Sequence, residues 1–472
     1  MTTLHDECTN YSPSMPRTSP LAHSSNLSIP LTSPSAGTAL PAVDWPQNKH
    51  LPLLFTPIVV GETAQLEFKN RIWVSSMCQY SCESKGENMG VMSMWQVVEL
   101  GSFAVKGAGL VMTEALAVEP RGRLSPQDAG LWNDRQRDAL KPILEFLQAN
   151  GARAGVQLCH SGRKGSTLAP FISGSTIAPH LASNIAGAES DGWPDKVIAP
   201  SPISHDGGKY PVPQEIGKKE LEEVKQAFKD AATRAVEAGA DVVEVHAAHG
   251  YLLHNFLSPI SNHRTDEYGG TLENRLRFPV EIIKIVRSVI PSHVVLSLRV
   301  SGTEWSPEGE KDESGEWISW GIEQSKVFAV EAIKAGIDLI DLSSGGNDTK
   351  QQIHTYPSYQ VPLAEAVKRS LPEDSKIPVS TVGLITQAHQ AESILQEGKA
   401  DVIKLGREFL RHSDVVFDWA MELGCVVNVP VQYQRAWTRM FKKVHENKVE
   451  APAGVDHGPS HLANEFQNGL KI

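Results

Sequence analysis

One phrase recurs through the middle of the chain: a helical segment ends in glycine, and a short β-branched or aliphatic run follows within one to three residues. The phrase occurs at residues 107–114, 151–158, 239–246, 336–342 and 398–405. Glycine is the usual residue just past a helix end, and short, continuously apolar runs suit parallel strands that are buried on both faces. Further apolar runs at 71–74, 294–299 and 377–382 raise the number of predicted strands to eight.

The segments between these runs read as helices. Residues 219–238, for example, place Leu221, Val224 and Phe228 on one helical face. Eight β–α units in one chain indicate an α/β fold of the closed (β/α)₈, or TIM, barrel type more than an open doubly wound sheet. No G-x-G-x-x-G motif follows a predicted strand, which further disfavours the open sheet.

The two ends of the chain differ from its middle in composition. Residues 1–48 are rich in Ser, Pro and Thr and lack apolar periodicity, so we expect a disordered arm. Residues 49–447 hold the barrel, and residues 448–472 read as a flexible tail. Long inserts at 162–216 and 302–320 follow predicted strands, so both are expected at the active-site end of the barrel, as a cap over the substrate.

The bulk numbers exclude several classes of partner. The net charge of −11 disfavours nucleic acid. No apolar stretch is long enough to span a bilayer, and no secretory signal is visible, so we expect a cytoplasmic protein without a membrane partner. Five scattered cysteines do not resemble a disulfide framework, and they do not predict a metal site.

The residues just past the strand ends carry the chemistry of a barrel. Here they are mostly hydrogen-bond donors with few carboxylates, which disfavours a divalent-metal hydrolase. Lys404 lies inside the last predicted strand without the charge pattern of an aldolase, and we interpret it as structural.

The strongest local motif is His246-Ala-Ala-His249-Gly-Tyr251. Two imidazoles three residues apart that leave a strand can point into one pocket and polarise a carbonyl oxygen. Tyr251 adds a phenol as a proton source. The alternatives are a zinc pair that lacks its other ligands and a pair of structural histidines.

Glycine residues close the last two predicted strands. Gly383 follows the seventh strand, and Gly406 precedes Arg407 after the eighth. Loops at these positions commonly bind phosphate in barrels, through free backbone N–H groups. The alternative is a glycine required by a turn beside a surface arginine.

Several longer motifs share a resemblance that extends from about residue 54 to residue 437. They are Lys69-Asn-Arg-Ile72, Met77-Cys-Gln-Tyr-Ser81, His160-Ser-Gly-Arg-Lys164, His246-Ala-Ala-His-Gly-Tyr251, Phe256-Leu-Ser-Pro259, Asp266-Glu-Tyr-Gly-Gly270 with Glu273-Asn-Arg275, Tyr359-Gln-Val-Pro362 and Leu405-Gly-Arg-Glu408. Together they resemble the old yellow enzyme family, and in particular its thermophilic-like, bacterial-type subgroup.

The resemblance implies FMN bound without a covalent link, with NADPH or NADH as the hydride donor and an enone- or enal-type small molecule as the acceptor. By position, the flavin would be contacted by Ser75, Ser76, Met77, Cys78, Ala115 and Gln157. Arg299 would lie near flavin N1 and O2, and Gly406 and Arg407 would hold the phosphate, with Gly383 close by. Such a fixed cation favours flavin reduction.

For the acceptor, the resemblance implies that His246 and His249 bind the carbonyl oxygen, that Tyr80 borders it and that Tyr251 delivers the proton. It also implies a homodimer or homotetramer in which Arg435 reaches the adjacent subunit's substrate pocket. A surface arginine beside a docked tryptophan is the alternative. We expect the loop 266–275 to be structural rather than catalytic.

The chain departs from the subgroup's pattern at Ser76, where proline is usual, and in its N-terminal arm and its insert near residues 305–320. Relatives that reduce dienoyl thioesters or oxidise amines carry an iron–sulfur cluster, for which this chain has no cysteine cluster. A flavin-dependent biosynthetic isomerase or dehydrogenase, or a flavin-binding sensor on the same barrel, remains the alternative function.

Overall fold

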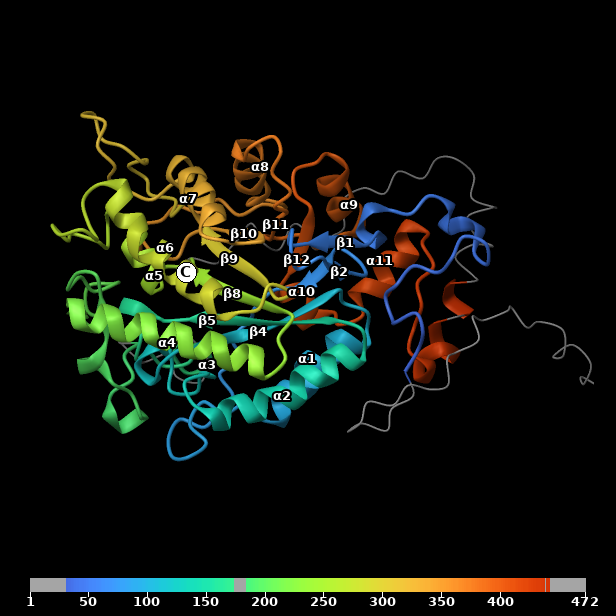
Figure 1. The fold of residues 1–472 in the computed structure, drawn as a ribbon, viewed down its shortest axis with the longest axis horizontal. Helices are drawn as coiled ribbons and strands as arrows, with labels where there is room; N and C mark the ends of the chain where they lie inside the picture. The colour runs from blue at the N-terminus through green and yellow to red at the C-terminus, as the bar shows by residue number, and fades with distance from the viewer. Residues whose placement is uncertain (1–30, 174–183, 438, 442–472) are drawn as a thin grey trace, which may run out of the picture.

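The computed structural model describes residues 31–173, 184–437 and 439–441. Its centre is a closed barrel of eight parallel strands, in which the last strand pairs with the first (Figure 1). In barrel order the strands are β3 (Ile72–Val74), β4 (Leu110–Ala117), β5 (Arg153–Cys159), β8 (Val242–Ala247), β9 (Val295–Ser301), β10 (Leu339–Ser343), β11 (Val379–Thr381) and β12 (Val402–Leu405). The predicted (β/α)₈ barrel is therefore confirmed, with all eight predicted strands in place.

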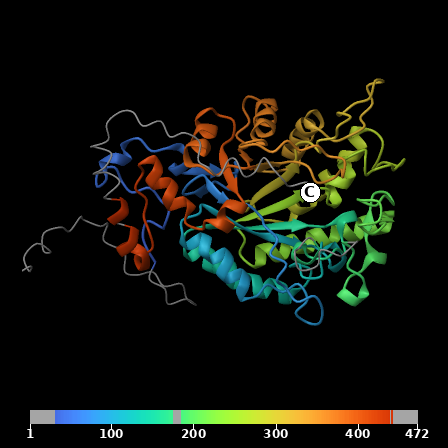
Figure 2. The same ribbon diagram turned by 180° about the vertical axis from the view of Figure 1, so that it is seen from behind.

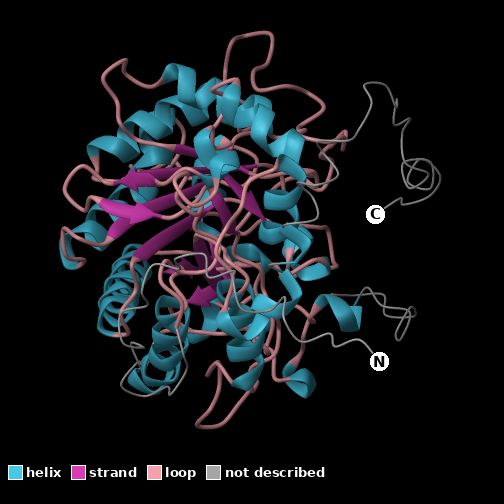
Figure 3. Ribbon diagram, turned by 90° about the vertical axis from the view of Figure 1, so that its right-hand side faces the viewer, coloured by secondary structure: helices cyan, strands magenta, loops and turns pink. Residues whose placement is uncertain are grey.

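Helices surround the strands on the outside (Figure 3). The longer ones are α1 (Met94–Val105), α2 (Asp134–Ala149), α4 (Lys218–Glu237), α6 (Leu272–Val289), α7 (Ile322–Lys334), α8 (Val361–Ser370), α9 (Ala388–Gln396) and α11 (Val415–Leu423). Shorter helices follow the strands at α3 (Pro170–Ser173), α5 (Leu252–Leu257) and α10 (Arg407–Arg411). Within the described part of the chain, no helix has the length and apolar character needed to cross a membrane.

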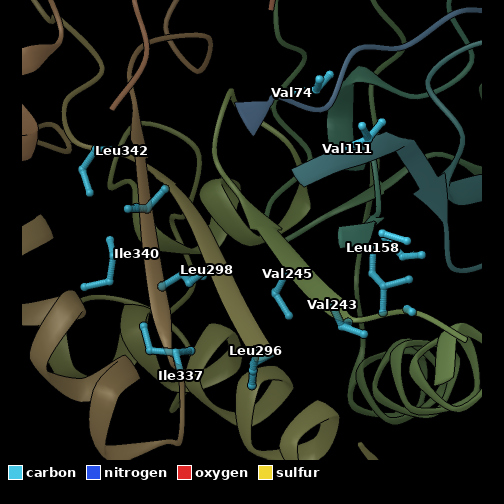
Figure 4. Packing of buried hydrophobic residues seen from close by; sticks show 14 of the residues in the cluster. Val74, Val111, Leu158, Val243, Val245, Leu296, Leu298, Ile337, Ile340 and Leu342 are labelled. Carbon is cyan, nitrogen blue, oxygen red and sulfur yellow. The ribbon is translucent and has the colours of Figure 1, made fainter. Parts of the chain in front are cut away.

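Strand side chains alternate between the two sides of the barrel wall. The outward ones, including Val243, Val245, Leu296 and Leu298, pack toward the helices (Figure 4). Inside the barrel, an apolar layer fills the amino end and is composed of Trp73, Leu110, Met112, Val242, Val295, Leu339 and Val402. Val60 and Phe68 join this layer from the hairpin of β1 (Ile58–Val60) and β2 (Leu66–Phe68). The inner wall toward the carboxyl ends is left for polar groups.

The segment before the barrel is ordered from residue 31 onward. Leu40 N–H donates to Val426 O over 2.9 Å, and the buried Asn48 side chain donates to the same oxygen over 2.7 Å. In Figures 1 and 2 this blue segment lies beside the red C-terminal segment. The prediction of disorder through residue 48 is therefore wrong for residues 31–48, because their backbone groups find partners far along the chain. The rest of the predicted arm and the tail 448–472 lie outside the described residues.

The two inserts follow β5 and β9. The first contains the short strands β6 (Ile198–Ala199) and β7 (Gln214–Glu215), which pair in parallel. In the second, Trp320 is fully buried and donates from Nε1 to Ser301 O over 2.7 Å, so this tryptophan belongs to the core. Trp305 lies near Tyr359, with 6.5 Å between ring centroids. A cap over the substrate stays a prediction.

Candidate active site

The inner wall of the barrel changes from apolar to polar along each strand. On β8 the inward positions are Val242, Glu244 and His246, and on β10 they are Leu339, Asp341 and Ser343. All six residues are buried. Since inward positions recur every second residue, the carboxyl end of the barrel receives a complete layer of charged and polar side chains. The candidate site lies on this layer.

A pocket of about 290 Å³ opens at the carboxyl ends of β3 and of β9 to β12. It gathers eight of the predicted site residues: Ser75, Ser76, Met77, His249, Arg299, Gly383, Gly406 and Arg407. Gly383 has φ +112°, and a Cβ there would lie 2.6 Å from Gln360 Nε2, so this position requires glycine. Arg407 forms no ion pair with any residue that the structure describes.

Arg299 is the buried cation of this pocket. Its NH1 atom donates to Ser75 Oγ over 2.8 Å, and its Nε lies 3.4 Å from Asp341 Oδ2. The Nε–H nevertheless finds no acceptor with hydrogen-bond geometry among the described residues. Arg299 therefore presents a buried positive charge to the pocket, beside the Asp341 carboxylate.

The loop after β3 lies against β4. Ala115 N–H bonds to the Cys78 thiol, and Gln79 N–H donates to Glu114 Oε2 over 3.1 Å. Burial, and then the nearby Asp128 and Glu114 carboxyls, raise the pKa of Cys78 well above its ordinary value. The thiol therefore stays protonated at neutral pH, unlike a nucleophilic cysteine.

Gln157 stands beside Ala115 in the β4–β5 register. Its Nε2 donates to Glu244 Oε1 over 2.8 Å, and no described residue donates to its Oε1. Tyr80, with φ +52°, ends the loop in the left-handed region. Cys78, Ala115, Gln157 and Tyr80 do not line the pocket itself, and their predicted contacts with flavin and substrate stay predictions.

The two predicted histidines are joined in one hydrogen-bonded chain. Ala248 N–H donates to His246 Nδ1, so the proton of His246 lies on Nε2. That atom lies 3.3 Å from His249 Nδ1, and His249 Nε2 lies 2.7 Å from Ser343 Oγ. Burial, and then Arg299, lower the pKa of both imidazoles well below the ordinary value. Both are therefore neutral donors.

Tyr251 packs against this pair. Its ring centroid lies 5.0 Å from that of His246 and 6.4 Å from that of His249. Burial, followed by the nearby Cys78, raises the pKa of Tyr251 well above its ordinary value, so the phenol keeps its proton.

The turn before Tyr251 depends on glycine. Gly250 has φ +73°, and a Cβ there would lie 2.2 Å from Gly346 O. His249 also lies in the left-handed region, with φ +59°. Such backbone conformations persist only where surrounding contacts hold them, and here they fix the direction in which Tyr251 leaves the strand.

Arg435 is the one predicted site residue that the structure places apart from the others. It is exposed, and residues 426–428, which precede its segment, run beside residues 37–40. Gln432, within the segment, lies near Ala149 and Asn150, just before β5. Gly37 in turn lies against Gly107, just before β4. The segment therefore lies at the amino end of the barrel, opposite the pocket.

Some partners within the site were not visible from the sequence. Gln360 accepts from Ser344 Oγ over 2.7 Å and lines the pocket, and Lys164 Nζ donates to His249 O over 2.9 Å. Both residues fall within motifs that the sequence shows, but their contacts depend on loops that meet only in the folded barrel.

A family model described as the NADH:flavin oxidoreductase / NADH oxidase family matches residues 53–423. The chain belongs to this family. It is an old yellow enzyme-type, NAD(P)H-dependent flavin oxidoreductase, and its cofactor is FMN.

Curated relatives of this old yellow enzyme-type chain are similar over most of their length. An NADH:flavin oxidoreductase of Gibberella zeae is 41% identical over 88% of this chain and 95% of its own. An NADPH dehydrogenase of Bacillus subtilis is 39% identical over 81% of this chain and 99% of its own. Among solved structures, morphinone reductase is 25% identical, with a TM-score of 0.60 over 83% of this chain and 93% of that one.

Proposed function

We propose that this flavin oxidoreductase is an ene-reductase, which reduces the carbon–carbon double bond of an α,β-unsaturated carbonyl compound. The observation that carries the proposal is the cluster of His246, His249 and Tyr251, in which two neutral imidazoles stand beside a protonated phenol. Such a cluster can stabilise charge on a carbonyl oxygen and supply a proton nearby. The relatives named NADPH dehydrogenase support a reduced nicotinamide as the hydride donor.

The pocket suits an anionic, planar cofactor. Arg299 places a buried cation at the pocket wall, and Arg407 has no ion-pair partner among the described residues. Gly383 and Gly406 line the same pocket without side chains. We assign the phosphate to Gly383, Gly406 and Arg407. The ring would contact Ser75, Ser76, Met77, Cys78, Ala115 and Gln157, with Arg299 at its pyrimidine side.

When bound, FMN supplies the two-electron chemistry, accepting a hydride from NAD(P)H and passing it to the β-carbon of the acceptor. The chain's own groups do the rest. A carbonyl oxygen would replace His249 Nδ1 and Ser343 Oγ as the acceptor of the two imidazole N–H groups. Tyr251 holds the proton for the α-carbon, and Tyr80 borders the acceptor.

The test uses the purified protein. A visible spectrum should show bound flavin, and NAD(P)H oxidation without oxygen should require an acceptor such as cyclohexenone. Flavin absorption with no acceptor-dependent NAD(P)H oxidation would contradict the ene-reductase proposal and favour a sensor or isomerase instead.

The histidine pair gives the first prediction. His246→Ala or His249→Ala should weaken the binding of a phenolate, which mimics the enolate, by about 2 kcal/mol, because a charge-assisted hydrogen bond is lost. FMN should stay bound. Titration of the flavin spectrum with a phenol measures the affinity, and His389→Ala, on an exposed side chain, is the control. An unchanged affinity in both site variants would remove the pair from this role.

Cys78 gives the second prediction. Because its thiol is held protonated beside Ala115, it should adjust the flavin without bonding to substrate. Cys78→Ala should shift the flavin reduction potential while turnover persists, and Cys82→Ala should leave the potential unchanged. A dead enzyme with an unshifted potential would indicate a nucleophilic cysteine instead.

Arg435 gives the third prediction, together with a proposed homodimer or homotetramer. Its segment lies away from its own pocket, and Trp437 packs on Phe417 with 5.0 Å between ring centroids, which anchors the segment. We propose that Arg435 enters the adjacent subunit's pocket. Arg435→Ala should keep FMN and the assembly but raise KM for the nicotinamide or the acceptor, whereas Arg439→Ala, which is also exposed, should not.

A subunit-mixing experiment distinguishes an Arg435 that acts in the adjacent subunit from one that acts within its own chain. If Arg435→Ala and Tyr251→Phe subunits exchange and Arg435 acts across the interface, a mixed dimer contains one site with both lesions and one intact site, so activity recovers. If Arg435 acts within its own chain, each site carries one lesion and no activity returns. A fully active monomer would also contradict the proposal.

A further inference from the structure

Lys404 lies in the interior of the barrel, with two carboxylates around it. The residue is 1% exposed, and its Nζ donates to Glu244 Oε2 over 2.6 Å and to Asp341 Oδ2 over 3.0 Å. The three residues come from β12, β8 and β10, at the second inward position of each strand. This cluster forms the polar layer above the apolar end of the barrel, and Lys404 contributes to the inner wall of the pocket.

Each carboxylate also contacts a residue of the proposed flavin site, Glu244 through a hydrogen bond and Asp341 through an ion pair. Glu244 Oε1 accepts from Gln157 Nε2 over 2.8 Å, which leaves the Gln157 Oε1 free to accept from a ligand. Asp341 Oδ2 lies 3.4 Å from Arg299 Nε. Lys404 is therefore connected to Gln157 through Glu244 and to Arg299 through Asp341. The proposed function places both Gln157 and Arg299 at the pyrimidine side of FMN.

Hydrogen bonds from serines complete the layer. Ser297 Oγ donates to Glu244 Oε2 over 2.8 Å, and Ser380 Oγ donates to Asp341 Oδ1 over 2.7 Å. Burial opposes ionisation of Asp341, but Lys404 and Arg299 outweigh it and hold the pKa of Asp341 below its ordinary value. Glu244 accepts hydrogen bonds from three side chains, Gln157, Ser297 and Lys404.

A purely structural role explains this arrangement poorly. Burying a lysine between two carboxylates removes three charges from water, and apolar side chains of similar volume often stabilise a core equally well. The neighbouring inward layer of the same barrel is apolar and closes it without charges. The charged layer occurs only where the inner wall meets the pocket.

We propose that Lys404 is a positioning residue for FMN: by neutralising Glu244 and Asp341, it fixes the Gln157 amide and the Arg299 guanidinium and so favours the reduced cofactor. The inference rests on the proposed placement of FMN at these two residues. The cluster of Lys404, Arg299, Glu244 and Asp341 is electrically balanced, with two cations and two carboxylates. Removal of the lysine would leave an excess negative charge beside Gln157 and Arg299, the residues that would hold the pyrimidine side of FMN, where reduction adds negative charge.

The experiment measures the flavin midpoint potential of the holoenzyme. Lys404→Met should lose at least tenfold in its preference for reduced over oxidised FMN, a potential lower by about 30 mV for a two-electron couple. Lys404→Met/Glu244→Gln restores the charge balance and should return most of that shift. Lys69→Met is the matched control, because the Lys69 Nζ is also buried but has no hydrogen-bond partner among the residues that the structure describes, and Lys69 lies at the amino end of the barrel.

The midpoint potential of each variant either supports or overturns the proposal. An FMN-bound Lys404→Met enzyme with the parental potential would overturn the proposal and leave Lys404 structural. If Lys404→Met does not fold, Glu244→Gln takes its place: it leaves an excess positive charge and should raise the potential, and an unshifted value overturns the proposal equally. Acceptor turnover is measured separately, so an enzyme that shows the shift but does not reduce enones would contradict the ene-reductase proposal alone.

Discussion

Replacement of Tyr251 with phenylalanine is expected to slow the reoxidation of the reduced enzyme by an enone about 10²- to 10⁴-fold, the usual contribution of a general acid. Reduction of the flavin by NAD(P)H should remain nearly unchanged, because that step needs no proton from the phenol. The phenol is the protonated group beside both imidazoles, with ring centroids 5.0 and 6.4 Å away. Stopped-flow measurement of the two half-reactions separates these effects.

The same phenol predicts a pH profile. Burial first, and then the neighbouring Cys78, raise the pKa of Tyr251 well above its ordinary value. The proton donor is therefore fully protonated below that ordinary value, and the reoxidation rate should show no loss from Tyr251 ionisation between about pH 6 and pH 9. A fall in this range that Tyr251→Phe abolishes would contradict the protonated phenol.

Tyr80 provides a sharp control, because its phenol also lies near the mouth of the barrel and burial raises its pKa as well. Tyr80→Phe should change acceptor affinity and leave the proton-transfer step largely intact. If the selective loss of reoxidation appears in Tyr80→Phe instead, Tyr80 is the donor. Equal slowing of both half-reactions in Tyr251→Phe would exclude Tyr251 from the role.

The strands of the barrel were predictable because of their burial. Strands covered on both faces read as continuous apolar runs, and a glycine at each helix end marks where several of them begin. On β8 the inward series Val242, Glu244, His246 even shows the order of the layers, from core to polar layer to site. A polar residue at every second position of an apolar run therefore indicates, from the sequence alone, a strand whose inner face leads to a polar site.

The partners across the barrel were not predictable in the same way. Lys404 reads as a single structural lysine, since Glu244 lies 160 residues away and Asp341 lies 63 away. Only closure of the barrel brings the three together. The segment 31–48 was misjudged for the same reason: its composition predicts disorder, but Asn48 and Leu40 bond to Val426 at the far end of the chain.

The loop 266–275 was expected to be structural, and Arg275 shows why. Arg275 is 1% exposed, and its guanidinium donates to Leu257 O, to Gly270 O over 3.2 Å and to Gln324 Oε1 over 2.7 Å. Leu257 ends α5, the helix that begins directly after Tyr251. The arginine therefore connects the helix after Tyr251, the loop and α7 without lining the pocket.

Arg275→Ala is expected to lower the free energy of unfolding by about 3–5 kcal/mol, because each buried acceptor left without a donor costs about 1–3 kcal/mol. Arg277→Ala, on the same helix with a 37% exposed side chain, should cost less than about 1 kcal/mol. Urea unfolding of the two variants, followed by circular dichroism, gives the comparison. Folded Arg275→Ala should still bind FMN and reduce an enone, because no acceptor of Arg275 lines the pocket. Parental stability combined with lost turnover would instead place Arg275 in the catalytic machinery.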